Sequence, residues 1–342
     1  MNIKNIVRFN LWTDPAFDRI LGAAEGIRLT VVDIGGSEDA AWAALIRAHI
    51  YQITSAKDEL PRHWHATRDL LARCPDLLCV STAGAGADTV DIQACTDAGV
   101  LVVNQAGGNA ASVAEHAVGL MLAVSRRFLE SDSRLRKERG FSREDLMGRE
   151  LHGKVLGLVG LGHAGSRVAR IAQAFEMPVL AFDPYLTLAE ITERGASPAG
   201  LDEILRRSDI VSLHCPLTAE TANLFNAAAF ASMKPGALFI TTARGGIHDE
   251  RALYAALAAG HLGGAGLDVW NEEPPPLGHP LLALDNVVAT FHTAGVTHEA
   301  RRNVATMAAE QIVKICSGSI PDRILNKKVL PRFQDRLGRL NG

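Results

Sequence analysis

A glycine-rich turn between an apolar strand and a helix is the feature that most constrains how this chain can fold. From Lys154 the sequence reads Lys-Val-Leu-Gly-Leu-Val-Gly-Leu-Gly-His-Ala-Gly-Ser-Arg-Val-Ala-Arg-Ile, so Gly160, Gly162 and Gly165 form a Gly-x-Gly-x-x-Gly pattern. The first glycine allows a tight turn, the second lets the backbone approach a pyrophosphate, and the third lets the helix pack closely on the strand. Because the N-terminus of the helix faces the negative charge, the turn predicts a dinucleotide site.

A second strand, Pro178-Val-Leu-Ala-Phe-Asp, ends in Asp183, 18 residues beyond Gly165. An acid near this offset accepts hydrogen bonds from the adenosine ribose hydroxyls and repels a 2′-phosphate. Pro184 and Tyr185 follow Asp183, and no Arg stands there to bind such a phosphate. We therefore expect NAD as the cofactor, with NADP less favoured.

Composition restricts the class of protein. The 342 residues are 47% hydrophobic and 21% charged, with a net charge of −3, which excludes a disordered chain and a basic nucleic-acid-binding surface. The most apolar run, Ala117 to Val124, is far too short to span a membrane, and the N-terminus lacks the apolar core of a signal peptide. We expect a soluble cytoplasmic protein that binds neither nucleic acid nor membrane.

Cysteine usage agrees with that compartment. The cysteines are odd in number and scattered, with no Cys-x-x-Cys pair: Cys74, Cys79, Cys95, Cys215 and Cys316. Such a pattern indicates reduced thiols, not a disulfide framework or a zinc site. We interpret His63 and His65, in Arg-His-Trp-His, as the solvated start of a helix and expect no metal.

Short apolar strands alternate with helical segments along most of the chain. In the first part they begin at Leu29, Leu77 and Val100, and in the second part they lie near 155–160, 179–183, 209–213, 237–242, 265–269 and 287–290. This rhythm is typical of βαβ units, so we predict an α/β fold with doubly wound parallel sheets. At ~100–200 residues per domain, two domains are expected.

Two helices outside these units are also predicted, and the C-terminal tail is not assigned to a helix. Ser112 and Glu115 match a capping box, and the helix that follows is expected to run to about Arg136. Residues 297–316 read as one amphipathic helix. The basic tail, 331–342, has little periodicity, so we expect it either to fray or to dock on the first domain.

Polar side chains follow successive strands of the second part. Arg244 follows one strand, Asp268 lies in the next with Glu273 five residues beyond, and His292 follows another. Ligands of open parallel sheets bind beyond the carboxyl ends of the strands, so these four side chains are expected at one edge, where the nicotinamide should lie.

These residue types suit hydride transfer to a carbonyl, which needs a proton donor and a group that holds the substrate anion. His292 changes protonation near neutral pH, and Arg244 presents a planar fork that matches a carboxylate and polarises the adjacent carbonyl. Glu273 would orient the imidazole and raise its pKa by opposite charge. Asp268 is expected to contact the nicotinamide or to shape the pocket.

Two further segments carry polar groups. His214 and Cys215 lie at another strand end and are interpreted as lining for the nicotinamide ribose, because no general base is evident for a Cys215 nucleophile. In the first part, a glycine-rich loop follows the strand ending at Val80. Its backbone N–H groups would form an anion nest for a small carboxylate, although a plain turn is about as consistent with the local sequence.

Together these segments resemble the D-isomer-specific 2-hydroxyacid dehydrogenases over roughly residues 50 to 325, including members similar to phosphoglycerate dehydrogenase and glyoxylate/hydroxypyruvate reductase. The matching segments are Gly84-Ala-Gly-Ala-Asp-Thr-Val-Asp, Ser112-Val-Ala-Glu-His, Gly160-Leu-Gly-His-Ala-Gly, His214-Cys-Pro-Leu-Thr, Ala243-Arg-Gly-Gly, Gly266-Leu-Asp-Val-Trp with Glu-Glu-Pro, and His292-Thr-Ala-Gly.

The resemblance implies roles for individual residues. Arg244 looks like the substrate-binding arginine, and Glu273 with His292 like the acid–histidine pair. The loop at Ala83, Gly84 and Ala85 looks like the nest for the substrate carboxylate. The residues expected at the cofactor are Gly160, Gly162, His163, Ala164, Gly165, Asp183, His214, Cys215, Pro216, Thr242, Ala243, Asp268, His292 and Gly295.

The resemblance also implies the domain organisation. It places two Rossmann-like domains in the chain, with the NAD-binding domain, 108–294, inserted into a flavodoxin-like substrate domain built from 1–107 plus 295–342. It further implies a homodimer built partly on the helix from Ser112.

The chain departs from the family pattern at positions that border the site. Thr241 stands where Asn is common, and Phe291 where Pro is common. Members similar to phosphoglycerate dehydrogenase usually offer an Arg to the anionic end of the substrate where Thr54 stands here; Thr82 occupies another such position, and Lys57 is close. These departures weaken a serine-pathway assignment.

We therefore expect an NAD-dependent D-2-hydroxyacid dehydrogenase that interconverts a 2-oxo acid and its (R)-2-hydroxy acid. Glu273 argues against formate oxidation, since formate dehydrogenases of this fold pair the histidine with Gln. Two alternatives stay open: a phosphite-type dehydrogenase, and an NAD(H)-sensing interaction protein similar to transcriptional corepressors.

Overall fold

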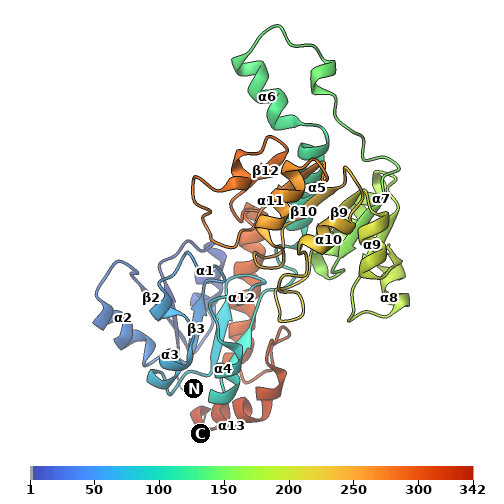
Figure 1. Ribbon diagram of the computed structural model, residues 1–342. Coiled ribbons are helices and arrows are strands. Elements are labelled where there is room, and N and C mark those ends of the chain that lie inside the picture. Colours follow the sequence, from blue (N-terminus) through green and yellow to red (C-terminus); the bar gives the residue numbers. More distant parts are fainter. Residues whose placement is uncertain (1–2, 342) are drawn as a thin grey trace. The chain divides into compact units, whose positions relative to one another are not determined.

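The computed structural model describes residues 3–341, which form two compact units. The first unit comprises Met1–Asn109 and Val296–Gly342, and the second comprises Ala110–Gly295 (Figure 1). The family resemblance placed the two domain boundaries after residues 107 and 294. In the structure the two units meet after residues 109 and 295.

The first unit is a parallel sheet with the strand order β2-β1-β3-β4-β5. Its strands are β1 (Lys4–Phe9), β2 (Ile27–Val32), β3 (Ile50–Ile53), β4 (Cys79–Thr82) and β5 (Leu101–Val103). Its helices are α1 (Ala16–Ala23), α2 (Glu38–Leu45), η1 (Arg62–Trp64), α3 (Arg68–Arg73), α4 (Ile92–Ala98), α12 (His298–Cys316), η4 (Lys327–Val329) and α13 (Leu330–Asn341).

The second unit is a parallel sheet with the order β12-β11-β10-β9-β6-β7-β8. Its strands are β6 (Leu156–Val159), β7 (Val179–Phe182), β8 (Ser197–Pro198), β9 (Ile210–Leu213), β10 (Leu238–Thr241), β11 (Gly264–Leu267) and β12 (Val287–Ala289). Its helices are α5 (Ala110–Ser125), α6 (Phe128–Lys137), η2 (Glu144–Leu146), α7 (His163–Ala174), α8 (Leu188–Glu193), α9 (Leu201–Arg207), α10 (Ala227–Ser232), α11 (Glu250–Ala258) and η3 (Pro280–Ala283).

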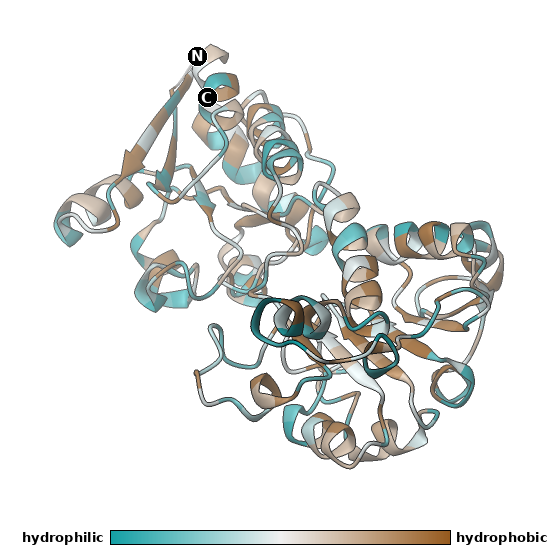
Figure 2. Ribbon diagram, turned by 90° about the horizontal axis from the view of Figure 1, so that it is seen from above, coloured by the Kyte–Doolittle hydropathy of each residue, from teal (hydrophilic) through white to brown (hydrophobic). Residues whose placement is uncertain are grey.

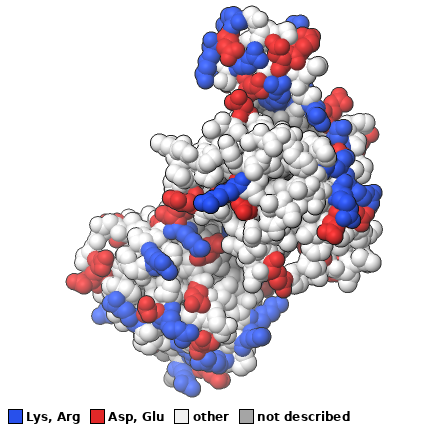
Figure 3. Space-filling model, in the orientation of Figure 1, with Lys and Arg blue, Asp and Glu red and all other residues white. Residues whose placement is uncertain are grey.

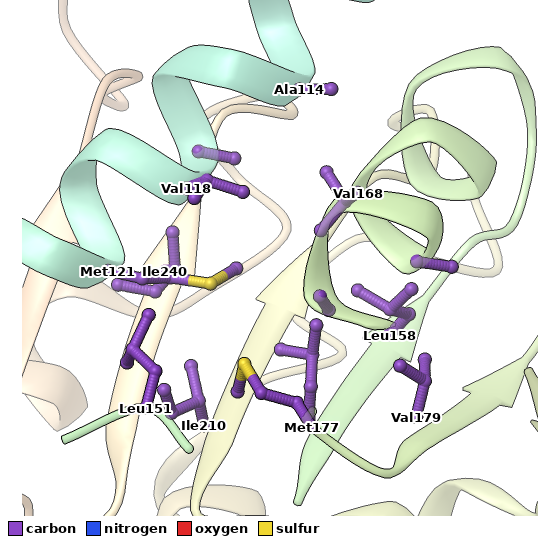
Figure 4. Packing of buried hydrophobic residues seen from close by; sticks show 14 of the residues in the cluster. Ala114, Val118, Met121, Leu151, Leu158, Val168, Met177, Val179, Ile210 and Ile240 are labelled. Carbon is purple, nitrogen blue, oxygen red and sulfur yellow. The ribbon is translucent and has the colours of Figure 1, made fainter. Parts of the chain in front are cut away.

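The predicted α/β class with doubly wound parallel sheets is confirmed, since each sheet is covered on both faces. Consecutive residues of a strand point to opposite faces. Leu158 accordingly packs in one core cluster with α5 and α7, and Val159 packs in another with α9 and α11. Figure 4 shows the first of these clusters, with the side chains of α5 and α7 meeting those of β6 and β10.

The first unit repeats this arrangement. Ile6 packs with α1, α12 and α13, whereas Val7 packs with α2, α3 and α4 on the other face. Full burial of a Val, Leu or Ile side chain contributes about 1.5–3 kcal/mol, so these clusters are what holds each sheet to its helices. Figure 2 shows hydrophobic colour on the strands and on the helix faces turned toward them.

Three strands were not anticipated. β1 is interrupted by Lys4, Asn5 and Arg8, β3 has only four residues, and β8 has only two, so none gives a strong apolar signal. β1 nonetheless pairs with both β2 and β3.

The single helix predicted from Ser112 to Arg136 is wrong. α5 already begins at Ala110, so Ser112 lies inside the helix and the predicted Ser112–Glu115 capping box does not mark its start. α5 ends at Ser125, and Arg127 adopts a left-handed φ of 53° before α6 begins. The helix is therefore two segments.

A returning segment explains this break. The backbone N–H of Arg149 donates to the carbonyl oxygen of Ser125 at 2.8 Å, which satisfies a group that a continuous helix would have used itself. Arg127 donates to the carbonyl oxygen of Asp145 at 2.9 Å and pairs with Glu130 at 2.7 Å. Contacts from residues distant in sequence thus fix the turn at Arg127.

The C-terminal segments pack on the first unit. α12 spans His298–Cys316, as predicted, and Thr297 caps it by accepting a hydrogen bond from Ala300 N at 3.1 Å. The tail forms α13, whose Phe333 and Leu337 are buried among the helices and strands of that unit. Of the two expectations for the tail, docking is confirmed for its described residues and fraying is wrong. No helix within 3–341 is long and apolar enough to cross a membrane.

Candidate active site

The glycine turn joins β6 to α7, and its backbone geometry explains each glycine. Gly160 has a φ of +92°, and a Cβ there would lie 2.7 Å from Cys215 N. A Cβ at Gly165 would lie 2.3 Å from the carbonyl oxygen of Gly160. At Gly162, which precedes the first turn of α7, a Cβ would meet nothing within 4 Å, so the backbone is open to a ligand on that side. The turn fits a pyrophosphate at the N-terminus of α7.

Asp183 follows β7 and is tied to this turn. Its carboxylate accepts hydrogen bonds from Leu161 N at 2.9 Å and from Tyr185 N at 3.1 Å. Both bonds leave further acceptor positions on the carboxylate oxygens. The geometry fits an acceptor for ribose hydroxyls beside the glycine turn.

His292 and Glu273 form a hydrogen-bonded pair. The distance from Nδ1 of His292 to Oε2 of Glu273 is 2.8 Å, and the other oxygen of Glu273 accepts from Trp270 N at 3.1 Å. The hydrogen bond to Glu273 raises the pKa of His292 above 6.5, although burial and the Arg244 charge act in the opposite direction. The expected effect of Glu273 on the His292 pKa is confirmed in direction, and Nε2 is left for a substrate.

Asp268 is fully buried and shapes the segment that carries His292. Its carboxylate accepts from the backbone N–H groups of Thr293 and Ala294, each at 2.9 Å, and from the hydroxyl of Thr290 at 2.6 Å. Its carbonyl oxygen accepts from His292 N at 2.6 Å, where His292 adopts a left-handed φ of 46°. Asp268 therefore holds the backbone of His292 in an uncommon conformation.

His116 is a site residue that sequence reasoning missed. It lies in α5, and its Nε2 is 2.9 Å from the Thr290 hydroxyl and 3.5 Å from the Asp268 carboxylate. The available signal was the Ser-Val-Ala-Glu-His segment, which was predicted to start a helix and matched the family pattern, but no role was assigned to its histidine.

Arg244 lies in the loop after β10, and this loop is pressed against the loop after β11. A Cβ at Gly245 would lie 1.9 Å from the carbonyl oxygen of Trp270, so only glycine allows the approach. Gly246 N donates to Oδ1 of Asn271 at 2.6 Å, and Asn271 N donates to Glu250 at 2.8 Å. Asn271 thereby connects the loop of Arg244 to the loop of Glu273, a link that the sequence did not reveal.

The strand ends next to the glycine turn carry buried polar atoms without partners in the described part of the chain. They are Nδ1 of His214 and the hydroxyl oxygen of Thr242. Burial lowers the pKa of His214 to about 4, so its ring is neutral near neutral pH. Unsatisfied buried atoms of this kind fit a polar cofactor that supplies the missing hydrogen bonds. Burial raises the pKa of Cys215 to about 11, which agrees with its interpretation as lining and not as a nucleophile.

The loop at residues 83–85 belongs to the first unit, and one part of the predicted nest is wrong. Ala83 N donates to the carbonyl oxygen of Ile53 at 2.7 Å and is not available to an anion. For the N–H groups of Gly84 and Ala85 we find no acceptor within residues 3–341. Asn104 donates to the carbonyl oxygen of Ala85 at 2.7 Å and holds the loop in place.

The other expected residues occupy varied surroundings. His163 and Ala164 begin α7, Ala243 is buried after β10, Pro216 is exposed after β9, and Gly295 is half-buried. His63 lies in a short 3-10 turn, and Nε2 of His65 lies 3.0 Å from the carbonyl oxygen of Leu60. The exposed Lys57 is absent from the lining of the pocket that contains Thr54.

Comparison with known proteins agrees with this geometry. A sequence model of the D-isomer specific 2-hydroxyacid dehydrogenase family, NAD binding domain, matches residues 118–294. A D-3-phosphoglycerate dehydrogenase from Archaeoglobus fulgidus is 43% identical over 250 residues, which are 73% of this chain and 47% of that protein. The chain thus spans about half the length of the curated relatives it matches.

Solved structures show the same fold over nearly the whole chain. D-lactate dehydrogenase from Aquifex aeolicus, complexed with NAD and lactic acid, has 27% identity and a TM-score of 0.81, covering 94% of this chain and 99% of that one. The TT0316 protein from Thermus thermophilus has 32% identity and the same TM-score and coverage. With the NAD-binding family matched across the glycine turn and through His292, the chain belongs to the D-isomer specific 2-hydroxyacid dehydrogenase family.

Proposed function

We propose that this protein is an NAD-dependent oxidoreductase that interconverts a 2-oxo acid and its (R)-2-hydroxy acid. The observation that carries the proposal is the His292–Glu273 pair, at 2.8 Å, in the same unit as the Arg244 loop and the glycine turn. These segments follow β12, β11, β10 and β6, and in parallel sheets the carboxyl ends of the strands share one edge.

The proton is moved by His292. With Nδ1 hydrogen-bonded to Glu273, Nε2 faces the substrate oxygen, donating a proton during reduction and accepting it during oxidation. Glu273 fixes the ring and stabilises the imidazolium, as its effect on the His292 pKa indicates. NAD, when bound, supplies or accepts the hydride.

The substrate is held by charge and by backbone donors. Arg244 binds the carboxylate and polarises the carbonyl, since a guanidinium fork matches two oxygen atoms. Its positive charge also opposes the protonation of His292, so the two groups are electrostatically coupled. In the first unit, the N–H groups of Gly84 and Ala85 are proposed donors to the substrate carboxylate.

The cofactor is bound in the second unit. Gly160, Gly162 and Gly165, with the start of α7, would hold the pyrophosphate, and Asp183 the adenosine ribose. His214 and Thr242 would contact the nicotinamide ribose. This role is supported by the buried Nδ1 of His214 and the buried hydroxyl oxygen of Thr242, which have no hydrogen-bond partner within residues 3–341. Asp268 would act through the loop of His292.

The test measures NADH oxidation with a panel of 2-oxo acids: glyoxylate, pyruvate, hydroxypyruvate, and branched-chain, aromatic and phosphorylated members. We expect clear turnover of at least one. Replacing His292 or Arg244 by Ala should then remove at least ~2–4 kcal/mol of transition-state stabilisation, while NADH binding stays largely intact. Near-normal turnover by both variants, or none by the wild type despite tight NADH binding, would sink the proposal.

A further inference from the structure

A pocket lies at the carboxyl ends of β1, β3 and β4 in the first unit. Its cavity volume is about 30 Å³, and its lining includes Arg8, Trp12, Gln52, Thr54, Ala83 and Arg301. Ala83 adjoins the N–H groups of Gly84 and Ala85, which the proposed function gives to the substrate carboxylate. The pocket thus begins beside the donors proposed for the substrate carboxylate, so the rest of a 2-oxo acid held there would extend toward it.

One arginine of this pocket has no anionic partner among the residues that the structure describes. Arg8 is paired with Asp18 at 2.7 Å and also donates to the carbonyl oxygen of Phe9 at 3.1 Å, so its charge is already matched. Arg301, at the start of α12, faces the ring of Trp12 with 5.7 Å from its guanidinium carbon to the ring centroid. Within residues 3–341 we find no carboxylate paired with Arg301.

Gln52 is an independent sign that the pocket receives a polar ligand. Gln52 is buried, with 6% of the residue exposed, and its Oε1 has no hydrogen-bond partner in the described chain. A buried unpaired amide oxygen costs free energy unless a ligand or water completes its bonds. Rotation of the amide about its last bond would present the NH₂ group, a donor for an anionic oxygen, at the same point.

The acidic residue of the lining is already occupied. Glu59 accepts a hydrogen bond from the Thr54 hydroxyl, and Thr54 also accepts from Ala56 N at 3.2 Å. With two guanidinium groups and one carboxylate, the lining has a formal charge of +1, and Arg301 is the group free to respond to a ligand. Trp12, which is 63% exposed, supplies an apolar wall beside it.

We propose that this pocket binds an anionic group, a carboxylate or a phosphate, at the far end of the 2-oxo acid, and that Arg301 is the residue that selects it. The inference rests on the proposed function and names its substrate class. The selecting charge then lies on α12, whereas the family pattern has an Arg at the position of Thr54.

The experiment compares substrates that differ only at the far end. One pair is 2-oxoglutarate and its uncharged isostere 5-methyl-2-oxohexanoate, and the other is phosphohydroxypyruvate and hydroxypyruvate. We expect the wild type to favour the charged member of at least one pair by about 10- to 100-fold in kcat/KM, as for a hydrogen bond to a charged group. The pair with the larger ratio identifies carboxylate or phosphate.

Variants assign this preference to one side chain. Arg301→Gln should reduce the preference for the charged member to near unity through KM, leaving turnover of the neutral member unchanged. Arg301→Lys should restore part of it. The matched control is Arg302→Gln, which removes an exposed neighbouring charge outside the pocket lining and should leave the ratio intact.

The outcomes separate the inference from the proposed function. Efficient turnover of neutral members with no preference for charged ones, or an equal loss for both members in Arg301→Gln, overturns the inference and leaves the oxidoreductase intact. Absence of turnover with every oxo acid overturns the proposed function, and the inference with it.

Discussion

At the scale of single residues, the proposed chemistry depends on how Glu273 and Asp268 constrain His292. The Glu273 carboxylate is hydrogen-bonded to the ring, and the Asp268 carboxylate accepts from the backbone N–H groups of the two residues that follow His292. The sequence indicated the acid–histidine pair because both residues follow strands. It could not indicate that the Asp268 carboxylate accepts hydrogen bonds from Thr290, Thr293 and Ala294, because those bonds depend on how the chain turns after β12.

The pKa of His292 leads to a pH prediction. Reduction of a 2-oxo acid requires protonated His292, so kcat/KM should be highest at low pH and fall as pH rises through the His292 pKa. Since Glu273 raises that pKa above 6.5, Glu273→Gln should shift the fall to lower pH. A pH profile of kcat/KM for both proteins checks this, and coincident profiles would contradict it.

The same shift affects stability, with a definite sign. A histidine whose pKa is raised on folding stabilises the fold fully below its unfolded pKa, and that contribution is lost as pH rises through its folded pKa. The wild type should therefore melt at a higher temperature than Glu273→Gln at low pH, and the difference between the two melting temperatures should become smaller as pH rises.

Cofactor choice is predicted to depend on Asp183. Asp183→Asn keeps an acceptor oxygen for Leu161 N but removes the charge that repels a 2′-phosphate. We expect the ratio of kcat/KM with NADH to kcat/KM with NADPH to fall about 10-fold or more. A 10-fold fall corresponds to a loss of ~1.4 kcal/mol in the preference for NADH. An unchanged ratio would show that another group excludes NADPH.

At the scale of elements, the glycine turn connects packing to binding. Gly165→Ala would place a methyl group 2.3 Å from the Gly160 carbonyl oxygen and push α7 away from β6. We expect a loss of stability of about 1–3 kcal/mol, typical of overpacking, together with weaker NADH binding. Thermal melts and NADH titration measure both.

Gly119 provides the control for that substitution. It lies inside α5, is exposed, and a Cβ there would meet nothing within 4 Å. Gly119→Ala should therefore stabilise the protein by about 0.5–1 kcal/mol through helix propensity. If both alanine variants behaved alike, the close approach at Gly165 would not be the cause.

The elements that sequence reasoning misjudged share one property. The end of α5 at Ser125 and the docking of α13 depend on partners far away in sequence, Arg149 in the first case and the core around Phe333 in the second. Strong local periodicity, by contrast, located α12 and most strands within one or two residues. Local patterns predict elements; distant contacts decide where they stop.

At the scale of the whole molecule, we propose a homodimer that uses α6 and the loop after it. No residue of α6 is buried, and large apolar side chains stand exposed there: Phe128, Leu129, Leu135 and Met147. Figure 3 shows charges of both signs over this region, in keeping with the Arg136–Asp132 and Arg134–Glu138 ion pairs of α6. Exposed apolar groups rimmed by charge are typical of a protein interface.

The dimer is testable by substitution on that surface. The double variant Leu135→Glu, Met147→Glu should convert a dimer to a monomer, because it places charges in an apolar interface. Leu188→Glu, on the equally exposed α8, is the control and should leave the mass unchanged. Light scattering coupled to size-exclusion chromatography measures the mass of each protein. A monomeric wild type, or a double variant that is still a dimer, would refute the proposed interface.

The sequence by itself determined the fold class, the dinucleotide turn and the strand ends that carry Arg244, Glu273 and His292. It could do so because glycine spacing and apolar periodicity act over a few residues. Only the tertiary structure brought Asn271, His116 and Arg301 to their sites, since each acts on a partner more than ten residues away in sequence. Their contacts follow from sheet order and loop packing, which no local pattern encodes.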